Sequence, residues 1–152
     1  KVAVNTAAVR DPALVRRLAD SFGSQCVVAA VDVRRNGPGW QVYVTGGREA
    51  TVREGIEWMA ELEQLGAGEI LLTSMDRDGT QQGYDLELLR AASRRVRIPV
   101  IASGGAGKLP DLADALEAGA HGVLAASIFH YQGCSLPEAR AFLKQRGFEV
   151  RP

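Results

Sequence analysis

Five short stretches of this chain are almost continuously apolar, and longer amphipathic segments separate them. Such runs are typical of strands that are buried on both faces, as in a parallel sheet. The pattern predicts strands at residues 2–5, 27–33, 70–75, 100–103 and 122–126.

The segments between these strands have apolar residues three or four positions apart, which is the spacing of one helix face. The clearest case predicts a helix over residues 52–65, with a stripe formed by Val52, Ile56, Met59, Leu62 and Leu65. Strands and helices therefore alternate along the chain.

The expected helix ends carry residues that usually cap helices. Asp11 followed by Pro12 predicts a helix start, and Ser135 with Glu138 predicts a capping box before the last helix. Glycines predict helix ends at positions 23, 66, 119 and 147.

One interval between strands is longer than the others, and its excess lies at residues 34–48. A turn signal at residues 36–39 precedes a partly alternating run that starts at Trp40. This pattern predicts a small hairpin raised above the sheet. Two interpretations stay open, a flexible lid and a purely structural hairpin.

Repeated βα units with polar or small residues at the strand ends favour a TIM barrel. A complete barrel has eight strands and typically about 250 residues. This chain has 152 residues and begins at Lys1, without an initiator methionine. We therefore expect an α/β fold of the (βα)8 TIM-barrel type, here an incomplete barrel of about five parallel strands with flanking helices. Residues 1–152 would form a single partial domain, the carboxyl-terminal part of a larger barrel whose amino-terminal strands are absent.

Composition and charge limit the classes of partner that we expect for this chain. Hydrophobic residues make up 46% of the chain and charged residues 24%, which is typical of a soluble α/β domain. The 18 Lys and Arg balance the 18 Asp and Glu, and no basic stripe is interleaved with aromatics, so we expect no nucleic-acid partner. The longest apolar stretch, residues 26–31, is far shorter than the roughly 18 residues of a membrane span, and no leader opens the chain. We expect no membrane partner and a cytoplasmic location.

Cysteine and histidine give no sign of a metal. Cys26 and Cys134 fit neither a disulfide framework nor a metal-ligand cluster, so we expect reduced thiols. His121 and His130 have no Cys, Asp or His neighbour at ligand spacing. We predict no metal and no cofactor.

Three strands lead directly into loops of small and polar residues. Residues 71–85 take an apolar strand into carboxylates, hydroxyls and glycine, and residues 103–107 and 126–127 follow two later strands. Backbone amides of small residues can approach a phosphate closely. Together these loops predict a site for a phosphorylated small molecule.

Asp32 ends the apolar run 27–31, where partial burial should raise its pKa toward the range useful for proton transfer. It is our candidate catalytic residue. The alternative is that Asp32 caps a loop or pairs with Arg34 or Arg35.

Further polar residues lie at the next strand ends. Asp78 is a second candidate carboxylate, either for proton transfer or for holding substrate hydroxyls. Asp76 is expected to fix its loop against Arg77. Thr73 and Ser103 should either contact substrate or line the barrel.

Several runs of the chain are similar to one family, namely residues 4–9, 22–25, 31–35, 66–85 and 102–107. Together they resemble the cyclase subunits of imidazole glycerol phosphate synthases, which act in histidine biosynthesis. The Arg-Asp-Gly-Thr portion also resembles the isomerase that acts one step earlier in the pathway. The start Asn-Thr-Ala-Ala and the ending Gly-Tyr-Asp favour the cyclase, and the isomerase stays as the alternative.

The resemblance implies a lyase that receives ammonia from a glutaminase partner in a heterodimer. Its substrate would be a ribulosyl-linked aminoimidazole carboxamide nucleotide with two phosphates. Its products would be imidazole glycerol phosphate and aminoimidazole carboxamide ribotide. The family uses an aspartate on each of two opposite strands as general acid and base. One of these matches Asp32, and the other would lie on a strand that this chain lacks.

The resemblance also implies which residues hold the two phosphates. Asn5 and Thr6 would belong to one site, with its remaining contacts on the absent strands. The other site would use amides that converge at short helix N-termini. Its residues would be Asp78, Gly79, Gly104, Gly105, Ala126 and Ser127.

Lys1 and Glu69 open two of the predicted strands, so both should lie at the end of the barrel away from the chemistry. The resemblance implies that they form a charged gate through which ammonia enters from the docked glutaminase. The alternative is an exposed ion pair that contributes little.

Two non-enzymatic interpretations also stay open. One is a half-barrel without chemistry that self-associates through its open sheet edges. The other is a phosphosugar or nucleotide-binding domain that has lost its chemistry. We expect the isolated chain to have negligible cyclase activity, because one catalytic aspartate and half of a phosphate site would be missing.

Overall fold

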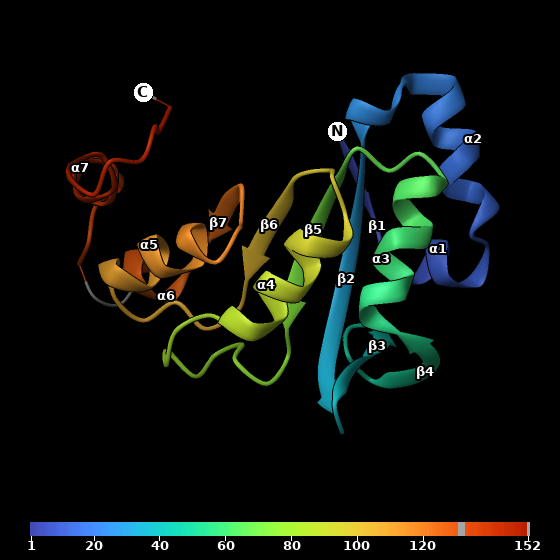
Figure 1. Ribbon diagram of the computed structural model, residues 1–152, viewed down its shortest axis with the longest axis horizontal. Helices are drawn as coiled ribbons and strands as arrows, with labels where there is room; N and C mark the ends of the chain where they lie inside the picture. Colours follow the sequence, from blue (N-terminus) through green and yellow to red (C-terminus); the bar gives the residue numbers. More distant parts are fainter. Residues whose placement is uncertain (131–132, 152) are drawn as a thin grey trace.

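The computed structural model describes residues 1–130 and 133–151. In this part of the chain the strands form one sheet, with helices packed along it (Figure 1). The strands are β1 (Val2–Val4), β2 (Val27–Asn36), β3 (Gly39–Val44), β4 (Glu49–Glu54), β5 (Glu69–Ser74), β6 (Val100–Ser103) and β7 (Gly122–Leu124). The helices are α1 (Thr6–Arg10), α2 (Ala13–Phe22), the 3-10 turn η1 (Ser24–Cys26), α3 (Gly55–Gln64), α4 (Leu86–Arg95), α5 (Leu109–Glu117), α6 (Ser127–His130) and α7 (Leu136–Gln145).

Parallel pairing runs through the sheet in the order β1-β2-β5-β6-β7. Each of these strands is joined to the next by at least one helix, so successive βα units lie side by side as in a TIM barrel. The strands expected from the apolar runs are all present. The last one ends at Leu124 rather than at residue 126, because α6 begins at Ser127.

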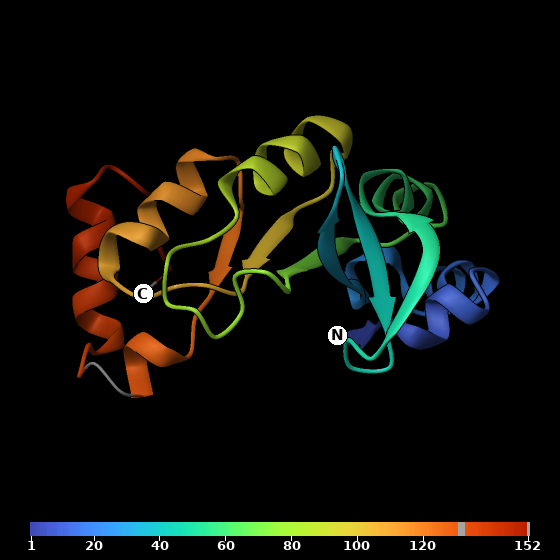
Figure 2. The same cartoon turned by 90° about the horizontal axis from the view of Figure 1, so that it is seen from below.

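The two faces of the sheet differ in polarity. On one face, helices such as α4 and α5 lie along the strands (Figure 2), and the strand residues are buried. They include Ala29, Val31, Val33, Ile70, Leu72, Val100 and Ala102. Residues at the alternate positions point to the opposite face and are less buried; Asp32, Thr73 and Ser103 are among them. This second face is the one that a closed barrel would enclose.

The parallel part of the sheet is open at both edges. Within the described residues, β1 pairs only with β2, and β7 pairs only with β6. Apolar side chains are exposed at these edges, with Val2 42% and Leu124 46% exposed. A closed barrel has no such edges. The fold is thus a mixed α/β structure with a mainly parallel sheet, consistent with a partial TIM barrel.

The hairpin expected at residues 34–48 forms, but it continues the sheet rather than standing above it. β2 extends to Asn36, and β3 and β4 add to it in antiparallel order. Trp40, Val42 and Val44 are buried in the added strands. Their burial favours the structural interpretation of this hairpin, and the lid interpretation stays an untested prediction.

The prediction of a helix from residue 52 was wrong in its first turn. Val52 lies in β4 with a fully exposed side chain, and α3 begins at Gly55. Pairing with β3 holds this segment as a strand, and the Glu54 carboxylate then caps α3 by accepting a hydrogen bond from the Glu57 N–H (2.9 Å). The remaining stripe positions pack into or against the core as expected.

Most of the predicted helix ends are confirmed. Ser135 and Glu138 form the expected capping box, and all the expected helix-ending glycines have positive φ. The assigned start of α2 is one residue later than expected, although hydrogen bonds from the Ala13 and Leu14 N–H groups help to lower the pKa of the Asp11 carboxyl. Pro12 occupies the N-cap position instead, and the Asp11 carboxylate pairs with Arg17 at 2.6 Å.

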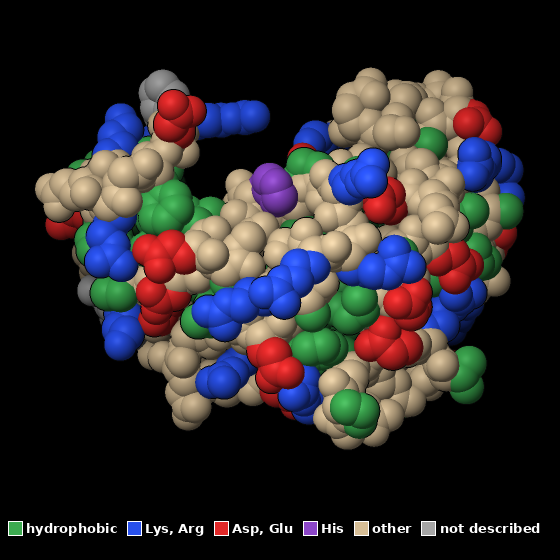
Figure 3. All heavy atoms as spheres, viewed as in Figure 1, with side chains coloured by type: hydrophobic (Ala, Val, Ile, Leu, Met, Phe, Trp, Pro, Cys, Tyr) green, Lys and Arg blue, Asp and Glu red, His purple; other side chains and the backbone are tan. Residues whose placement is uncertain are grey.

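Charges of both signs are mixed on the helical face of the molecule. Figure 3 shows Lys and Arg next to Asp and Glu there, without a field of one sign. The equal totals of basic and acidic residues agree with this view. Of the helices in the described residues, none has the length and apolar character needed to cross a membrane.

Candidate functional site

A row of side chains crosses the open face of the sheet at the carboxyl ends of the strands. Asp32 on β2 is in register with Thr73 on β5, which is in turn in register with Ser103 on β6. Leu124 on β7 continues the row beside Ser103. Register partners on parallel strands point to the same face. The sheet therefore brings these side chains to one surface.

Asp32 is the carboxylate of this row. Its Oδ2 accepts a hydrogen bond from Asn5 Nδ2 at 2.8 Å. Burial raises the pKa of Asp32, the nearby charge of Asp78 raises it further, and hydrogen bonds from Thr73 and Asn5 partly offset the increase. A carboxyl group with a raised pKa exchanges its proton more readily near neutral pH. This environment suits a general acid or base.

The alternative in which Asp32 pairs with a neighbouring arginine does not occur among the described ion pairs. Arg34 lies 3.9 Å from the Asp76 carboxylate and stacks over the Tyr43 ring. Arg35 binds Glu87 at 2.9 Å. Asp32 therefore has amide and hydroxyl partners but no paired cation in the described structure.

A small cavity of about 60 Å³ lies between the loops that follow β5, β6 and β7. Ser103, from the polar row, lines it. So does every residue that the family resemblance assigns to one phosphate site, namely Asp78, Gly79, Gly104, Gly105, Ala126 and Ser127. The structure brings these residues together, and phosphate binding by them stays a prediction.

Gly104 and Gly105 let the loop after β6 pass very close to the loop after β5. Their φ angles are 90° and 110°. A Cβ on Gly105 would lie 2.3 Å from the Gly83 carbonyl oxygen, and one on Gly104 would lie 2.8 Å from that of Ser74. A hydrogen bond from the Gly83 N–H to the Gly105 carbonyl at 2.8 Å joins the two loops at this point. A larger residue would push the two walls of the cavity apart.

Asn5 and Thr6 lie on the other side of Asp32 from this cavity, because β1 and β5 flank β2 on opposite sides. The Thr6 hydroxyl accepts a hydrogen bond from the Thr45 N–H at 2.9 Å, which ties it to the turn between β3 and β4. Asn5 Oδ1 is buried and has no hydrogen-bond partner in the described structure. Asp32 thus lies between the two predicted phosphate sites.

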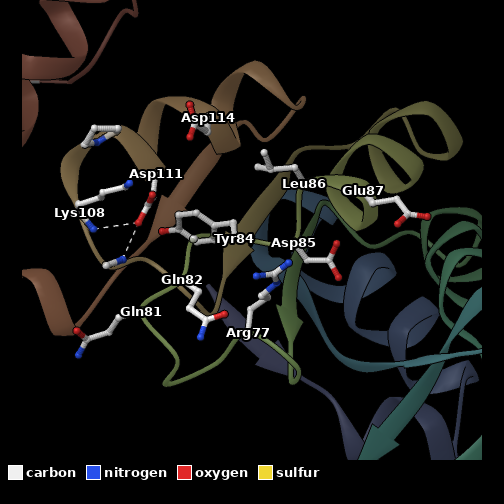
Figure 4. A pocket seen from close by; sticks show the side chains of 13 residues that line it. Arg77, Gln81, Gln82, Tyr84, Asp85, Leu86, Glu87, Lys108, Asp111 and Asp114 are labelled. Carbon is white, nitrogen blue, oxygen red and sulfur yellow. Dashed lines mark hydrogen bonds between the residues drawn. The ribbon is translucent and has the colours of Figure 1, made fainter.

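Two residues to which the sequence pattern assigned no role shape these loops. Asp111 is 5% exposed, and its Oδ2 accepts hydrogen bonds from the N–H groups of Gly107 (2.8 Å) and Lys108 (2.9 Å; Figure 4). Tyr84 donates to the Leu124 carbonyl at 2.8 Å, and burial raises the pKa of its hydroxyl. For Asp111, a proline followed by an acid in the first helical turn was the available signal.

A larger cavity of about 590 Å³ opens next to these loops, between the loop after β5 and the start of α5 (Figure 4). Its lining includes Arg77 and Lys108, but also Asp85, Asp111 and Asp114. The mixed charges indicate no preference for an anion, so this cavity is a poorer phosphate candidate than the small one.

The prediction that Asp76 holds its loop against Arg77 was wrong. Asp76 Oδ2 instead accepts a hydrogen bond from the backbone N–H of Arg35 at 2.7 Å. The chain turns back at Ser74, and Arg77 lines the larger cavity. The Asp76 side chain therefore contacts β2, whereas the Arg77 side chain faces the larger cavity.

Lys1 and Glu69 meet at the opposite end of the same open face. Lys1 Nζ and the Glu69 carboxylate form an ion pair, with the Lys1 side chain 52% exposed and that of Glu69 21% exposed. The position expected from the sequence is confirmed, whereas the role as an ammonia gate stays a prediction.

No metal centre is evident in residues 1–130 and 133–151, where no group of three or more His, Cys, Asp or Glu side chains is placed to hold an ion. His121 lies beside the backbone, with its Nδ1 3.4 Å from the Val100 nitrogen. The prediction of a metal-free protein remains to be tested.

Comparisons with known proteins agree with the geometry. Residues 1–135 match the protein family described as "Histidine biosynthesis protein". Over 151 residues, 99% of this chain, the sequence is 58% identical to the imidazole glycerol phosphate synthase subunit HisF of Pyrobaculum aerophilum. The chain spans about 60% of the length of that curated relative.

Proposed function

This chain belongs to the histidine biosynthesis protein family, and we propose from this premise that it is part of the cyclase subunit of an imidazole glycerol phosphate synthase. The complete enzyme would be a lyase. It would use ammonia to convert a bisphosphorylated ribulosyl aminoimidazole carboxamide nucleotide into imidazole glycerol phosphate and aminoimidazole carboxamide ribotide.

The observation that carries the proposal is the placement of Asp32 between two predicted phosphate sites. On one side lies the cavity formed by the loops after β5, β6 and β7. On the other side lie Asn5 and Thr6 at the end of β1. A substrate with a phosphate at each end would be held across the strand ends, with its reacting centre near the Asp32 carboxylate.

Asp32 would move protons in the reaction. Its raised pKa keeps part of the population protonated closer to neutral pH, which supports exchange in either direction. Thr73 and Asn5 would hold the carboxylate through their hydrogen bonds. The complementary aspartate would come from a strand outside this chain.

Ammonia would enter at the other end of the open face. The Lys1–Glu69 pair lies there and would act as the charged gate, next to the surface on which a glutaminase partner docks. A single exchangeable ion pair is suited to such a gate, because breaking it costs little when both groups reach water.

The chain would supply the carboxyl-terminal part of the barrel. Its open edges at β1 and β7 would receive the strands that close the barrel and that carry the second aspartate. We therefore expect negligible turnover by the 152-residue chain alone. Adding a separate polypeptide that carries the missing strands would restore turnover.

The test is to mix this chain with the part of the Pyrobaculum aerophilum relative that lies outside the match. Turnover of the bisphosphorylated substrate with ammonium salts should appear in the mixture and be absent from either piece. The same mixture carrying Asp32→Asn should be inactive. Offering the isomerase substrate in parallel separates the two enzymes of the pathway.

Three results would contradict the proposal. Isomerase turnover without cyclase turnover would assign the chain to the sister enzyme. Full cyclase activity of the isolated chain would refute both its incomplete nature and the site assignment. Stable symmetric dimers of the chain that exclude the complementary piece and show no turnover would favour the self-associating half-barrel.

A further inference from the structure

At the end of the β2–β5 ladder, a side-chain carboxylate accepts a hydrogen bond that a strand carbonyl would otherwise accept. The last backbone hydrogen bond runs from the Met75 N–H to the Val33 carbonyl at 2.9 Å. In a continuing parallel ladder the Arg35 N–H would donate next to the Met75 carbonyl. Here it donates to Asp76 Oδ2 at 2.7 Å. The Asp76 carboxylate takes the place of the next ladder carbonyl.

Because the Asp76 side chain accepts this hydrogen bond, the backbone can turn away from β2 after β5 while the loop stays bonded to β2. Immediately after the strand, the N–H groups of Arg77 and Asp78 both donate to the Ser74 carbonyl, at 3.2 and 2.9 Å. The resulting tight turn delivers Asp78 and Gly79 to the small cavity. Asp76 is thus the point at which this turn is tied to its neighbour.

The other end of the tie is also held firmly. Arg35 binds both oxygens of Glu87, at 2.9 and 3.0 Å, and lies over the Trp40 ring at 4.6 Å. Glu87 is in the first turn of α4, and Trp40 is buried in β3. These exposed side-chain contacts add little by themselves, but the backbone of Arg35 is also held by its pairing with Trp40 in the β2–β3 ladder, three residues beyond Asp32.

We propose that Asp76 is a positioning residue, which sets the distance between Asp32 and the Asp78–Gly79 wall of the phosphate cavity. This inference rests on the proposed function. The carboxylate contacts no substrate itself. It acts by holding two segments that must meet opposite ends of one ligand, and a misplacement of about 1 Å in such a site is enough to lower the rate substantially.

The matched variants follow from the hydrogen bond. Asp76→Ala removes the acceptor for the Arg35 N–H. Asp76→Asn keeps an acceptor oxygen of the same reach, and Asp76→Glu keeps the acceptor on a longer arm. Asp11→Ala is the control, because it removes an exposed carboxylate whose ion pair is with Arg17 in α2 and not with β2 or the loop after β5.

Two measurements test the proposal. The first is a titration of the 152-residue chain with inorganic phosphate, followed by the amide NMR signals of Gly79, Gly104 and Gly105. The second is kcat and KM of the complemented enzyme. Asp76→Ala should weaken phosphate binding and lower kcat by at least about tenfold, and Asp76→Asn should restore both to within about threefold. Asp76→Glu should fall between them, and Asp11→Ala should match the wild type.

Failure of the inference differs from failure of the proposed function. If wild-type chain binds phosphate at these amides but the complemented enzyme does not turn over, the proposed function fails, and the phosphate affinities alone decide the role of Asp76. If Asp76→Ala merely lowers stability, with phosphate affinity and kcat unchanged, the residue is structural and the inference is refuted. An Asp76→Asn variant as impaired as Asp76→Ala refutes the hydrogen-bond tie. Should Asp76→Ala not fold, Asp76→Glu gives the same decision.

Discussion

The charged side chains at the two ends of the open sheet face lie in opposite kinds of environment. At the carboxyl ends of the strands, Asp32 is half-buried with neutral hydrogen-bond partners, and burial together with the nearby Asp78 charge raises its pKa. At the amino ends, Lys1 and Glu69 form a matched pair that stays accessible to water. A carboxyl group without a cation can change its protonation state at modest cost, whereas a matched pair resists such a change. The first end therefore suits the proposed proton transfer, and the second suits a contact that can break and re-form.

The backbone does not follow the same division. The loops at the carboxyl ends approach one another so closely that a Cβ on Gly105 would lie 2.3 Å from the Gly83 carbonyl oxygen. At the amino ends, Gly122 is open, with the nearest atoms to a Cβ 3.7 Å away, whereas a Cβ on Gly68, directly before β5, would lie 2.1 Å from the Ser24 carbonyl oxygen. Close packing of this kind leaves little room for substitution at either end of the sheet.

The largest effect should come from removing the proposed proton-transfer group, the Asp32 carboxylate. We expect Asp32→Asn to lower kcat of the complemented enzyme by at least about a thousandfold, because an amide cannot accept the proton. Phosphate binding at the Gly79 and Gly104 amides should be nearly unchanged, because neither side of that cavity is altered. Steady-state kinetics and the phosphate titration measure the two effects separately.

A loss of phosphate binding as large as the loss of kcat would break this distinction, since it would mean that Asp32→Asn disturbs the fold. Thr73→Val is the matched variant in the same row. It removes one hydrogen bond to Asp32 and should reduce kcat by only about tenfold.

The next largest effect should be on stability, at the crowded loops. Gly105→Ala puts a Cβ 2.3 Å from the Gly83 carbonyl oxygen at a φ of 110°, and we expect it to lower the free energy of unfolding by about 3 kcal/mol. Gly79→Ala also forces a positive φ, but nothing lies within 4 Å of its Cβ. It should cost only about 1 kcal/mol. Urea unfolding of both variants measures the difference, and equal losses would show that crowding does not matter.

The sequence was informative where one local pattern decides the structure. Apolar runs located the parallel strands, and the position of Asp32 at the carboxyl end of β2 could be predicted because it directly follows such a run. Val52 was assigned to a helix because its spacing fits one, whereas the pairing of its segment with β3 in a hairpin makes it part of a strand. Local periodicity does not contain that contact.

The same limit applies to the site. Asp78 and Gly104 were assigned to the phosphate site from their motifs, and that role stays a prediction. The hydrogen bond from Arg35 to Asp76, in contrast, joins residues that are 41 positions apart in the chain. Asp76 lies next to Arg77, and the sequence therefore suggested the wrong partner. Only the end of the β5 ladder reveals that a backbone N–H needs an acceptor there.

A smaller effect should appear in the pH dependence of stability. The pKa of Asp32 is raised in the folded state, so the folded protein binds this proton more tightly than the unfolded chain does. The resulting stabilisation is complete below the ordinary value of 3.8 and is lost as the pH rises through the folded-state pKa. Asp32→Asn cannot ionise. It should therefore be more stable than wild type at pH 7 and equal to it at low pH, as measured by urea unfolding.

Asp11 gives the control of opposite sign. Arg17 lowers the pKa of the Asp11 carboxyl, so its stabilisation is present above 3.8 and is lost as the pH falls through the folded-state pKa. Asp11→Asn should be less stable than wild type at pH 7 and equal to it at low pH. If both substitutions change the free energy of unfolding at pH 7 in the same direction, the environment of Asp32 does not cause its effect on stability.

The smallest effect on stability should come from the amino ends. Glu69→Gln removes an accessible ion pair, and we expect a loss of at most about 1 kcal/mol in the free energy of unfolding. If the pair is a gate, the variant should still change how ammonia is used. In the complemented enzyme with its glutaminase, turnover from glutamine should fall several-fold, while turnover from added ammonium salts should not change. Equal activities with both nitrogen sources would leave the pair with a structural role only, and the two ends of the face would then differ in stability but not in function.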